Sequence, residues 1–203
     1  LADINIVALS TGSELTVNRL WQSDELSTGN MILVVEGEAL TLVNDGAIVS
    51  GSGSVDLRTT GITQGITTNA PVSTQSGNIG MTATGAVAQN SNISSTGNGN
   101  IAVNAQGGAI SMLTGVTTQS VNGLIDYDAS TDATIQTLMS TSAGTITVDA
   151  QDDITLEGMI RSQDSSVRIT SAAGSVQMTT AGSVVEGTHT GAAVGNTDLT
   201  VDV

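Results

Sequence analysis

A short motif recurs along the chain at a nearly constant interval. Its clearest form reads Gly-x-Ile-x-Val-x-Ala, and its first apolar residue returns every 21 to 24 residues. These first apolar positions are Val55, Ile79, Ile101, Ile125, Ile146 and Val167. A period of this length is the signature of a solenoid, in which one unit cannot bury its apolar face alone and must stack on its neighbours. The repeat therefore favours a stack of coils over a compact globular domain.

Apolar and polar residues alternate within each copy of the motif. Ile146, Val148 and Ala150 lie on one face of such a segment, and Thr147 and Asp149 lie on the other. Alternation with a period of two indicates β-strands, whose successive side chains point to opposite faces. The abundance of β-branched residues and the frequent glycines disfavour helices.

Each repeat contains two further apolar sets. The second set is predicted at Val87, Ile110, Ile135, Ile154 and Val176. The third set is predicted at Ile93, Val116, Leu138, Ile160 and Val184. We therefore predict an all-β, right-handed parallel β-helix of about 21–24 residues and three short strands per coil; right-handed winding is the rule for parallel crossovers. A β-sandwich array is the alternative fold, but it does not explain the recurrence of the motif.

The whole chain is predicted to be one β-helix segment of a larger protein. Irregular coils occupy 1–52, with a corner insertion at 18–30, and regular coils occupy 53–185. An insertion and a final partial coil fill 186–203. We expect Trp21 to cover the apolar end of the stack, because an open end of a β-helix is an exposed edge.

The composition limits the classes of partner and the kind of core. The chain has 19 acidic residues against 4 basic ones, a net charge of −15, no cysteine and no phenylalanine. Binding to nucleic acid needs clustered cations, which are absent, and no apolar run is long enough for membrane insertion. Without cysteine the fold must be held by stacking, and without phenylalanine the core must be made of thin aliphatic layers.

Three acidic residues, Asp149, Asp152 and Asp153, cluster at one predicted corner. Calcium takes six to eight oxygen ligands, so these carboxylates can supply part of a calcium site. The alternative is a solvated corner without a ligand, which is the usual role of a run of charges. We favour the solvated corner and predict no metal or cofactor site, with calcium at these three residues as the alternative.

Asp126 and Asp128 flank Tyr127 and are predicted to point outward, with Asp149 nearby on the next coil. Paired carboxylates can act as acid and base on a glycan when their separation suits the mechanism. Such a site would also need an aromatic groove, yet alternation turns Tyr127 inward. The single histidine, His189, lies in a glycine-rich corner and is predicted to be an exposed loop residue. We therefore predict no catalytic residue and a protein that is not an enzyme.

The sequence of the repeat resembles that of the filamentous-haemagglutinin-type exoproteins and adhesins of Gram-negative bacteria. Residues 144–162 carry the resemblance most clearly, and 98–113 and 166–180 are similar. The resemblance extends from about residue 53 to the last residue. It implies a long right-handed β-helical stalk that is exported to the cell surface and used in adhesion or aggregation.

Repeat and resemblance together predict a structural stalk segment of a surface-exposed or secreted bacterial adhesin. The expected partners are neighbouring segments of the same long chain and, for a binding role, host or cell-surface glycans or proteins. One alternative is a self-assembling extracellular filament subunit, in which open ends or the uncharged stretch 59–125 associate chain to chain. A lesser alternative is a β-helical polysaccharide lyase or hydrolase.

Overall fold

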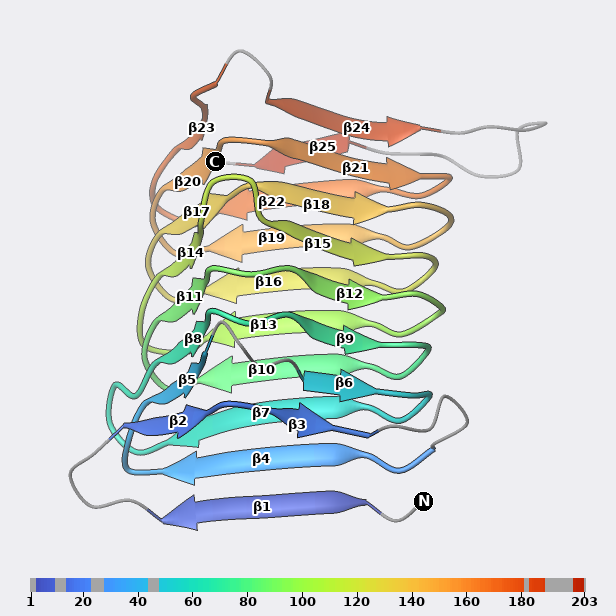
Figure 1. The fold of residues 1–203 in the computed structure, drawn as a ribbon. Helices are drawn as coiled ribbons and strands as arrows, with labels where there is room; N and C mark the ends of the chain where they lie inside the picture. The colour runs from blue at the N-terminus through green and yellow to red at the C-terminus, as the bar shows by residue number, and fades with distance from the viewer. Residues whose placement is uncertain are drawn as a thin grey trace.

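The chain forms a β-solenoid with one strand of each of three parallel sheets in every coil (Figure 1). The computed structural model describes residues 3–9, 14–22, 28–43, 48–180, 183–188 and 199–202. All secondary structure in these ranges is β-structure, and no helix in them is long and apolar enough to cross a membrane. The predicted all-β parallel solenoid with three strands per coil is confirmed.

The strands of each sheet stack along the solenoid axis. Sheet A contains, in stacking order, β1 (Ile4–Leu9), β4 (Met31–Glu36), β7 (Val55–Thr60), β10 (Ile79–Ala83), β13 (Ile101–Ala105), β16 (Ile125–Ala129), β19 (Ile146–Ala150), β22 (Val167–Ser171) and β25 (Leu199–Asp202). Sheet B contains β2 (Leu15–Val17), β5 (Leu40–Leu42), β8 (Ile66–Thr68), β11 (Val87–Gln89), β14 (Ile110–Met112), β17 (Ala133–Ile135), β20 (Ile154–Leu156) and β23 (Val176–Met178). Sheet C contains β3 (Leu20–Trp21), β6 (Ile48–Ser50), β9 (Val72–Thr74), β12 (Ile93–Ser95), β15 (Thr117–Ser120), β18 (Thr137–Ser140), β21 (Met159–Gln163) and β24 (Val184–Thr188).

The first apolar ladder pairs in the predicted register. Equivalent residues stack in the order Val55, Ile79, Ile101, Ile125, Ile146 and Val167. All six side chains are buried, and they face a continuous aliphatic core that runs along the axis. Neighbouring coils therefore bury each other's apolar faces, at the ordinary inter-strand spacing of about 4.8 Å.

The second and third ladders differ from the prediction at three positions. Ala133, and not Ile135, pairs with Ile110, because the corner before β17 is shorter than the one before β14. In sheet C the core position opposite Ile93 is Thr118, while Val116 lies in the preceding corner.

The third difference lies at the C-terminal end of sheet C. Val185, and not Val184, continues the column that passes through Ile160. Val184 instead pairs with Met159 and is exposed. Because a strand alternates its side chains, a shift of one residue moves a side chain from the core to the surface.

A column of glycines forms the corner that leads into sheet A. Its members are Gly29, Gly53, Gly77, Gly99, Gly123 and Gly144. A Cβ atom added to any glycine of this column from Gly53 onward would collide with the carbonyl oxygen of the glycine one coil below. The glycine of the repeated motif is therefore required by the close approach of successive backbones.

A second column of side chains lies beside the glycines. Each member accepts a hydrogen bond from the backbone N–H of the equivalent residue in the next coil, over 2.7 to 3.1 Å. The acceptors are Asp3, Asn30, Ser54, Asn78 and Asn100. This ladder fixes the register of the corner from coil to coil and satisfies backbone donors outside the sheets.

The two irregular regions join the coils as follows. The expected corner insertion at 18–30 contains β3, which pairs with β6, so part of it belongs to sheet C. At the other end, β25 pairs with β22. His189, with the rest of 189–198, lies outside the described residues.

Candidate functional site

Three carboxylates gather on the outer face of sheet A. Asp126 and Asp128 project from β16 because the residues between and beside them, Ile125, Tyr127 and Ala129, are buried. Asp128 stands directly opposite Asp149 of β19 in the parallel register. The prediction that stacking places Asp149 beside this pair is confirmed.

Each carboxylate has a partner on an adjacent coil. The Thr147 hydroxyl donates to Asp126. The Asn104 side-chain amide donates to Asp128 over 3.2 Å. Arg168 donates to Asp149 over 2.7 Å and forms an ion pair with it.

Asp128 is the carboxylate whose ionisation is most affected by this arrangement. Partial burial raises its pKa above the ordinary value, and the charges of Asp126 and Asp149 raise it further. The physical cause is that desolvation and like charges both disfavour the ionised form.

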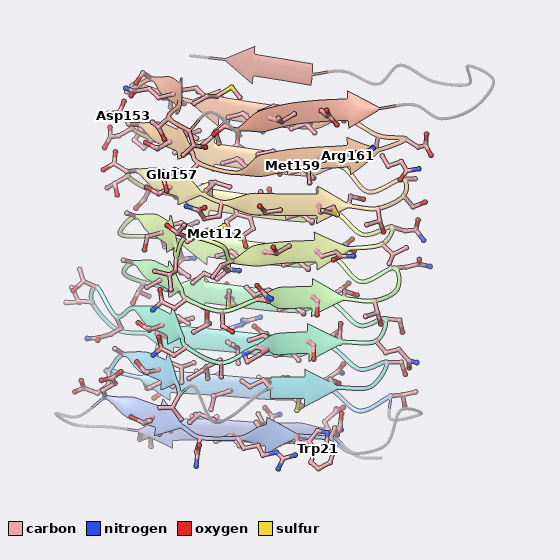
Figure 2. The ribbon with its side chains drawn as sticks, turned by 45° about the horizontal axis from the view of Figure 1, so that its top comes forward. Trp21, Met112, Asp153, Glu157, Met159 and Arg161 are labelled. Carbon is pink, nitrogen blue, oxygen red and sulfur yellow. The ribbon has the colours of Figure 1, made fainter. Side chains whose placement is uncertain are left out.

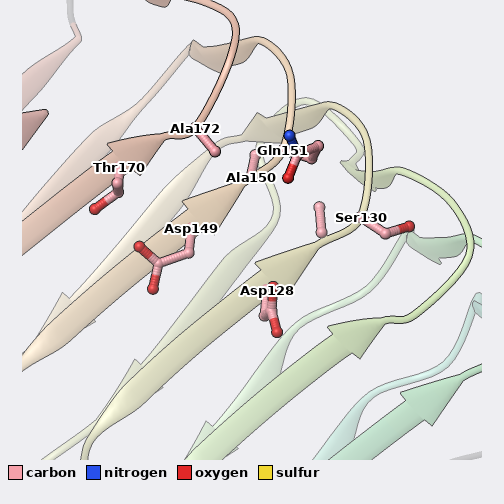
Figure 3. A pocket seen from close by; sticks show the side chains of 8 residues that line it. Asp128, Ser130, Asp149, Ala150, Gln151, Thr170 and Ala172 are labelled. Atoms are coloured by element: carbon pink, nitrogen blue, oxygen red, sulfur yellow. The ribbon is translucent and has the colours of Figure 1, made fainter. Parts of the chain in front are cut away.

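A shallow depression of about 290 Å³ lies beside these carboxylates (Figure 3). Its lining includes Asp128, Ser130, Asp149, Gln151, Thr170 and Ala172, which come from three successive coils. Three alanines give this surface an apolar part, and the carboxylates, Ser130, Gln151 and Thr170 can form hydrogen bonds with hydroxyl groups. The aromatic ring nearest in sequence, that of Tyr127, is completely buried behind it.

The three residues considered as calcium ligands lie apart in two settings. Asp149 lies on the outer face of sheet A with Arg168, whereas Asp152 and Asp153 are exposed at the corner before β20. Asp153 accepts hydrogen bonds from the Ser175 backbone N–H and hydroxyl, which lower its pKa. Among the described residues, no group of three or more acidic or histidine side chains is arranged to hold a metal ion.

Trp21 lies at the opposite end of the stack from Asp153 (Figure 2). The prediction that it covers the open end is wrong. Trp21 is 52% exposed on the outer side of sheet C, and Leu20 beside it packs against the core instead. The Arg19 guanidinium lies 4.2 Å from the centre of the indole ring, an arrangement typical of a cation–π contact.

The sequence did not point to a buried polar cluster that joins all three sheets. The Tyr127 hydroxyl donates to Gln89 and hydrogen-bonds Thr118, each over 2.6 Å, and Gln89 donates to Thr118 over 2.9 Å. All three side chains are fully buried. These residues lie far apart in the sequence, so no local pattern predicts the cluster. Only the register of the coils brings them together.

Comparisons with known proteins add no relative to this description. No protein-family model matches the chain, and neither the curated proteins nor the solved structures give a match.

Proposed function

We propose that the chain is a stiff stalk segment of a surface-exposed or secreted bacterial adhesin. Its role is to hold other parts of a longer molecule at a fixed distance and orientation. The observation that carries this proposal is the unbroken parallel register of sheet A, which passes through nine strands from β1 to β25. A continuous hydrogen-bonded sheet along the axis resists bending, and it leaves each coil in contact only with its neighbours.

The core supports the same role. Buried aliphatic residues form one continuous core that extends along the axis from Met31 to Ile169. One buried polar cluster, Gln89 with Thr118 and Tyr127, is hydrogen-bonded among its own members. We infer from this that the segment transmits load and has no need of internal motion.

We propose that the Asp126, Asp128 and Asp149 group forms part of the surface of a mechanical stalk and does not catalyse a reaction. A glycan-cleaving enzyme holds its sugar against aromatic side chains in a groove. Here the neighbouring depression is shallow and lined by small residues, and Tyr127 is enclosed in the core. The acidic face then keeps the rod soluble and resists unspecific contact.

To test the stalk proposal, the chain is displayed on the surface of bacteria, with and without a reporter adhesive domain fused at its distal end. If the chain is a stalk, the bacteria are expected to adhere only when the reporter domain is present. Duplicating residues 79–145, three coils in register, is expected to keep adhesion and to lengthen the purified rod by roughly 14 Å in X-ray scattering. Replacing Asp126, Asp128 and Asp149 together by asparagine is expected to change neither result.

Two outcomes would contradict the stalk role. One is attachment of the displayed chain to glycans or host proteins without the reporter, lost in the triple asparagine variant. The other is turnover of acidic or neutral polysaccharides by the purified chain, lost in the same variant. The first would make the segment a binding module, and the second an enzyme.

A further inference from the structure

Two Asn-Gly steps lie one above the other at the corner between sheets C and A. They are Asn98-Gly99, which leads into β13, and Asn122-Gly123, which leads into β16, and the sequence contains no other such step. Both asparagine side chains are exposed, whereas both glycines are buried. An asparagine that precedes glycine can lose its side-chain amide, because glycine has no side chain to hinder the attack of its own nitrogen on the asparagine Cγ.

The side-chain amides of the two steps are hydrogen-bonded to each other, and the bond treats them differently. The Asn122 amide nitrogen donates to the Asn98 side-chain oxygen over 2.6 Å. A donor at this oxygen stabilises the negative charge that the oxygen acquires when a nucleophile adds to Cγ. No described residue donates to the Asn122 side-chain oxygen. The Asn98 Cγ is therefore the more electrophilic of the two.

The backbone N–H groups of the two glycines differ as well. The Gly123 N–H donates over 2.9 Å to the hydroxyl of Ser120, which in turn donates to the Gly99 carbonyl. Ser95 pairs with Ser120 in the coil below, and its buried hydroxyl oxygen has no partner among the described residues. Within the same part of the chain nothing accepts a hydrogen bond from the Gly99 N–H. The nitrogen of Gly99 is thus available to react, and that of Gly123 is held by Ser120.

We propose that Asn98 is a site of spontaneous deamidation in the folded chain and that the fold protects Asn122 from the same reaction. The Gly99 nitrogen attacks the Asn98 Cγ and loses its proton, and a new N–Cγ bond closes a five-membered succinimide. The Cγ–Nδ2 bond then breaks, and Nδ2 leaves as ammonia with that proton. No catalyst, oxidant or reductant is needed.

Water completes the reaction by opening the succinimide ring. Its oxygen adds to one of the two ring carbonyls, and the bond from that carbonyl carbon to the Gly99 nitrogen breaks. Attack at Cγ gives an ordinary aspartate at position 98. Attack at the backbone carbonyl gives isoaspartate, in which the main chain runs through the former side chain and is longer by one carbon.

Either product changes the surface and the corner at this point of the stack. Residues 59–125 contain no charged side chain, so the new carboxylate is the first charge in that stretch. The isoaspartate form also adds a backbone carbon directly before Gly99, where successive backbones already leave no room for a Cβ. The inference does not depend on the proposed stalk function, because it rests only on this corner.

The two stacked steps provide an internal comparison for the experiment. The purified chain is kept in mildly alkaline buffer, and proteolytic fragments are examined over time by mass spectrometry for replacement of NH2 by OH and for isoaspartate. In the folded chain Asn98 is expected to react at least roughly fivefold faster than Asn122, the effect of one hydrogen bond. In guanidinium, where the contacts are lost, the two rates are expected to become similar.

Two variants test the two contacts separately. Asn122→Ala removes the donor to Asn98 from an exposed position and is expected to slow the reaction at Asn98 by roughly fivefold. Ser120→Ala releases the Gly123 N–H and is expected to speed the reaction at Asn122 by a similar factor, with circular dichroism confirming that the variant is folded. Asn98→Ser is the matched control, and ion exchange is expected to show only the slow gain of charge from Asn122.

The proposal is overturned if Asn98 stays intact in the folded chain, or if Asn122 reacts as fast as Asn98 or faster. An unchanged rate at Asn98 in the Asn122→Ala variant would also overturn it. So would a preference for Asn98 that persists unchanged in guanidinium, since the local sequence and not the fold would then select the site.

Discussion

At the scale of single residues, the fold depends on positions where a side chain has no room. The glycine of the repeated motif lies against the carbonyl group of the glycine one coil below. Its role is to let successive backbones approach, since none of the glycines in this column has a positive φ. The glycine that marks a turn in the sequence therefore also meets a packing requirement.

Replacing Gly99 by alanine is expected to destabilise the protein by about 2–4 kcal/mol. The added Cβ would collide with the backbone of Gly77 and with the Ser95 hydroxyl. The matched control is Gly80→Ala in β10, where the nearest atom, an Asp56 carboxylate oxygen, would lie 3.6 Å away. Chemical denaturation measures both. Equal midpoints for the two variants would show that the glycine column carries no special packing.

Tyr127 is the other residue whose environment gives a measurable property. Complete burial raises its pKa, and the hydrogen bonds to Thr118 and Gln89 offset only part of this effect. The folded pKa thus lies above the unfolded value of about 10. The stability that comes from the neutral phenol is fully present below pH ~10 and falls as the pH rises towards the folded pKa.

Because the chain has one tyrosine, alkaline titration followed by absorbance reports on this phenol alone. We expect no tyrosinate near pH 10, and then its appearance together with the loss of β-structure in circular dichroism. Tyr127→Phe should show no absorbance change and should lose about 1–3 kcal/mol of stability, since Gln89 and Thr118 lose a buried partner. Titration near pH 10 in a folded chain would contradict the enclosed hydroxyl.

At the scale of elements, the parallel register decides which side chains meet. It places Asp128 beside Asp149 on the outer face of sheet A and places Asp153 below Ser175 at a corner. The two carboxyl pKa values move in opposite directions for this reason: that of Asp128 is raised and that of Asp153 is lowered. Stability should therefore respond oppositely to their removal.

Asp128→Asn is expected to raise stability at neutral pH by a few tenths of a kcal/mol, a size that reflects solvent screening of an exposed group. A raised folded pKa favours the folded state most below the unfolded pKa near 3.9, and that contribution is lost as the pH rises through the folded value. The variant should hence differ from the wild type at pH 7 and match it in acid.

The opposite variant, Asp153→Asn, serves as the control. Its lowered pKa contributes stability above the unfolded value, which is lost as the pH falls. Asp153→Asn should then destabilise the protein at pH 7 by removing the charged acceptor for Ser175. Denaturation curves at pH 7 and pH 3 measure both variants. A shift of the same sign for the two would contradict these assignments.

The length of the corners between strands decided which parts of this arrangement could be predicted from the sequence. Six successive strands of sheet A, from β4 to β19, are each entered through a glycine corner, so the glycine motif gave the right ladder and the right neighbours for Asp128. The corners before sheets B and C vary in length, so spacing alone gave the wrong register at Ile135, Val116 and Val184, although Ile135 and Val116 are themselves buried in the core. Trp21 was misassigned because only the pairing of β3 with β6 defines which side of the strand it occupies.

At the scale of the whole molecule, each coil contacts only the coils above and below it. Every strand pairs with its equivalents in adjacent coils, and all described pairings are parallel. Stability is therefore close to a sum of contributions from individual coils and their interfaces. Loss of an end coil should leave the rest of the stack folded.

Each coil contains a long stretch of chain but adds little to the length of the rod. The coil from Ile101 to Leu124 holds 24 residues, which would span roughly 80 Å when extended, yet it adds only about 4.8 Å to the rod. Under a pulling force, coils that peel from one end one at a time would each release that slack while the remaining coils stay folded. A stack of this design would therefore lengthen many-fold under load before its backbone is fully extended.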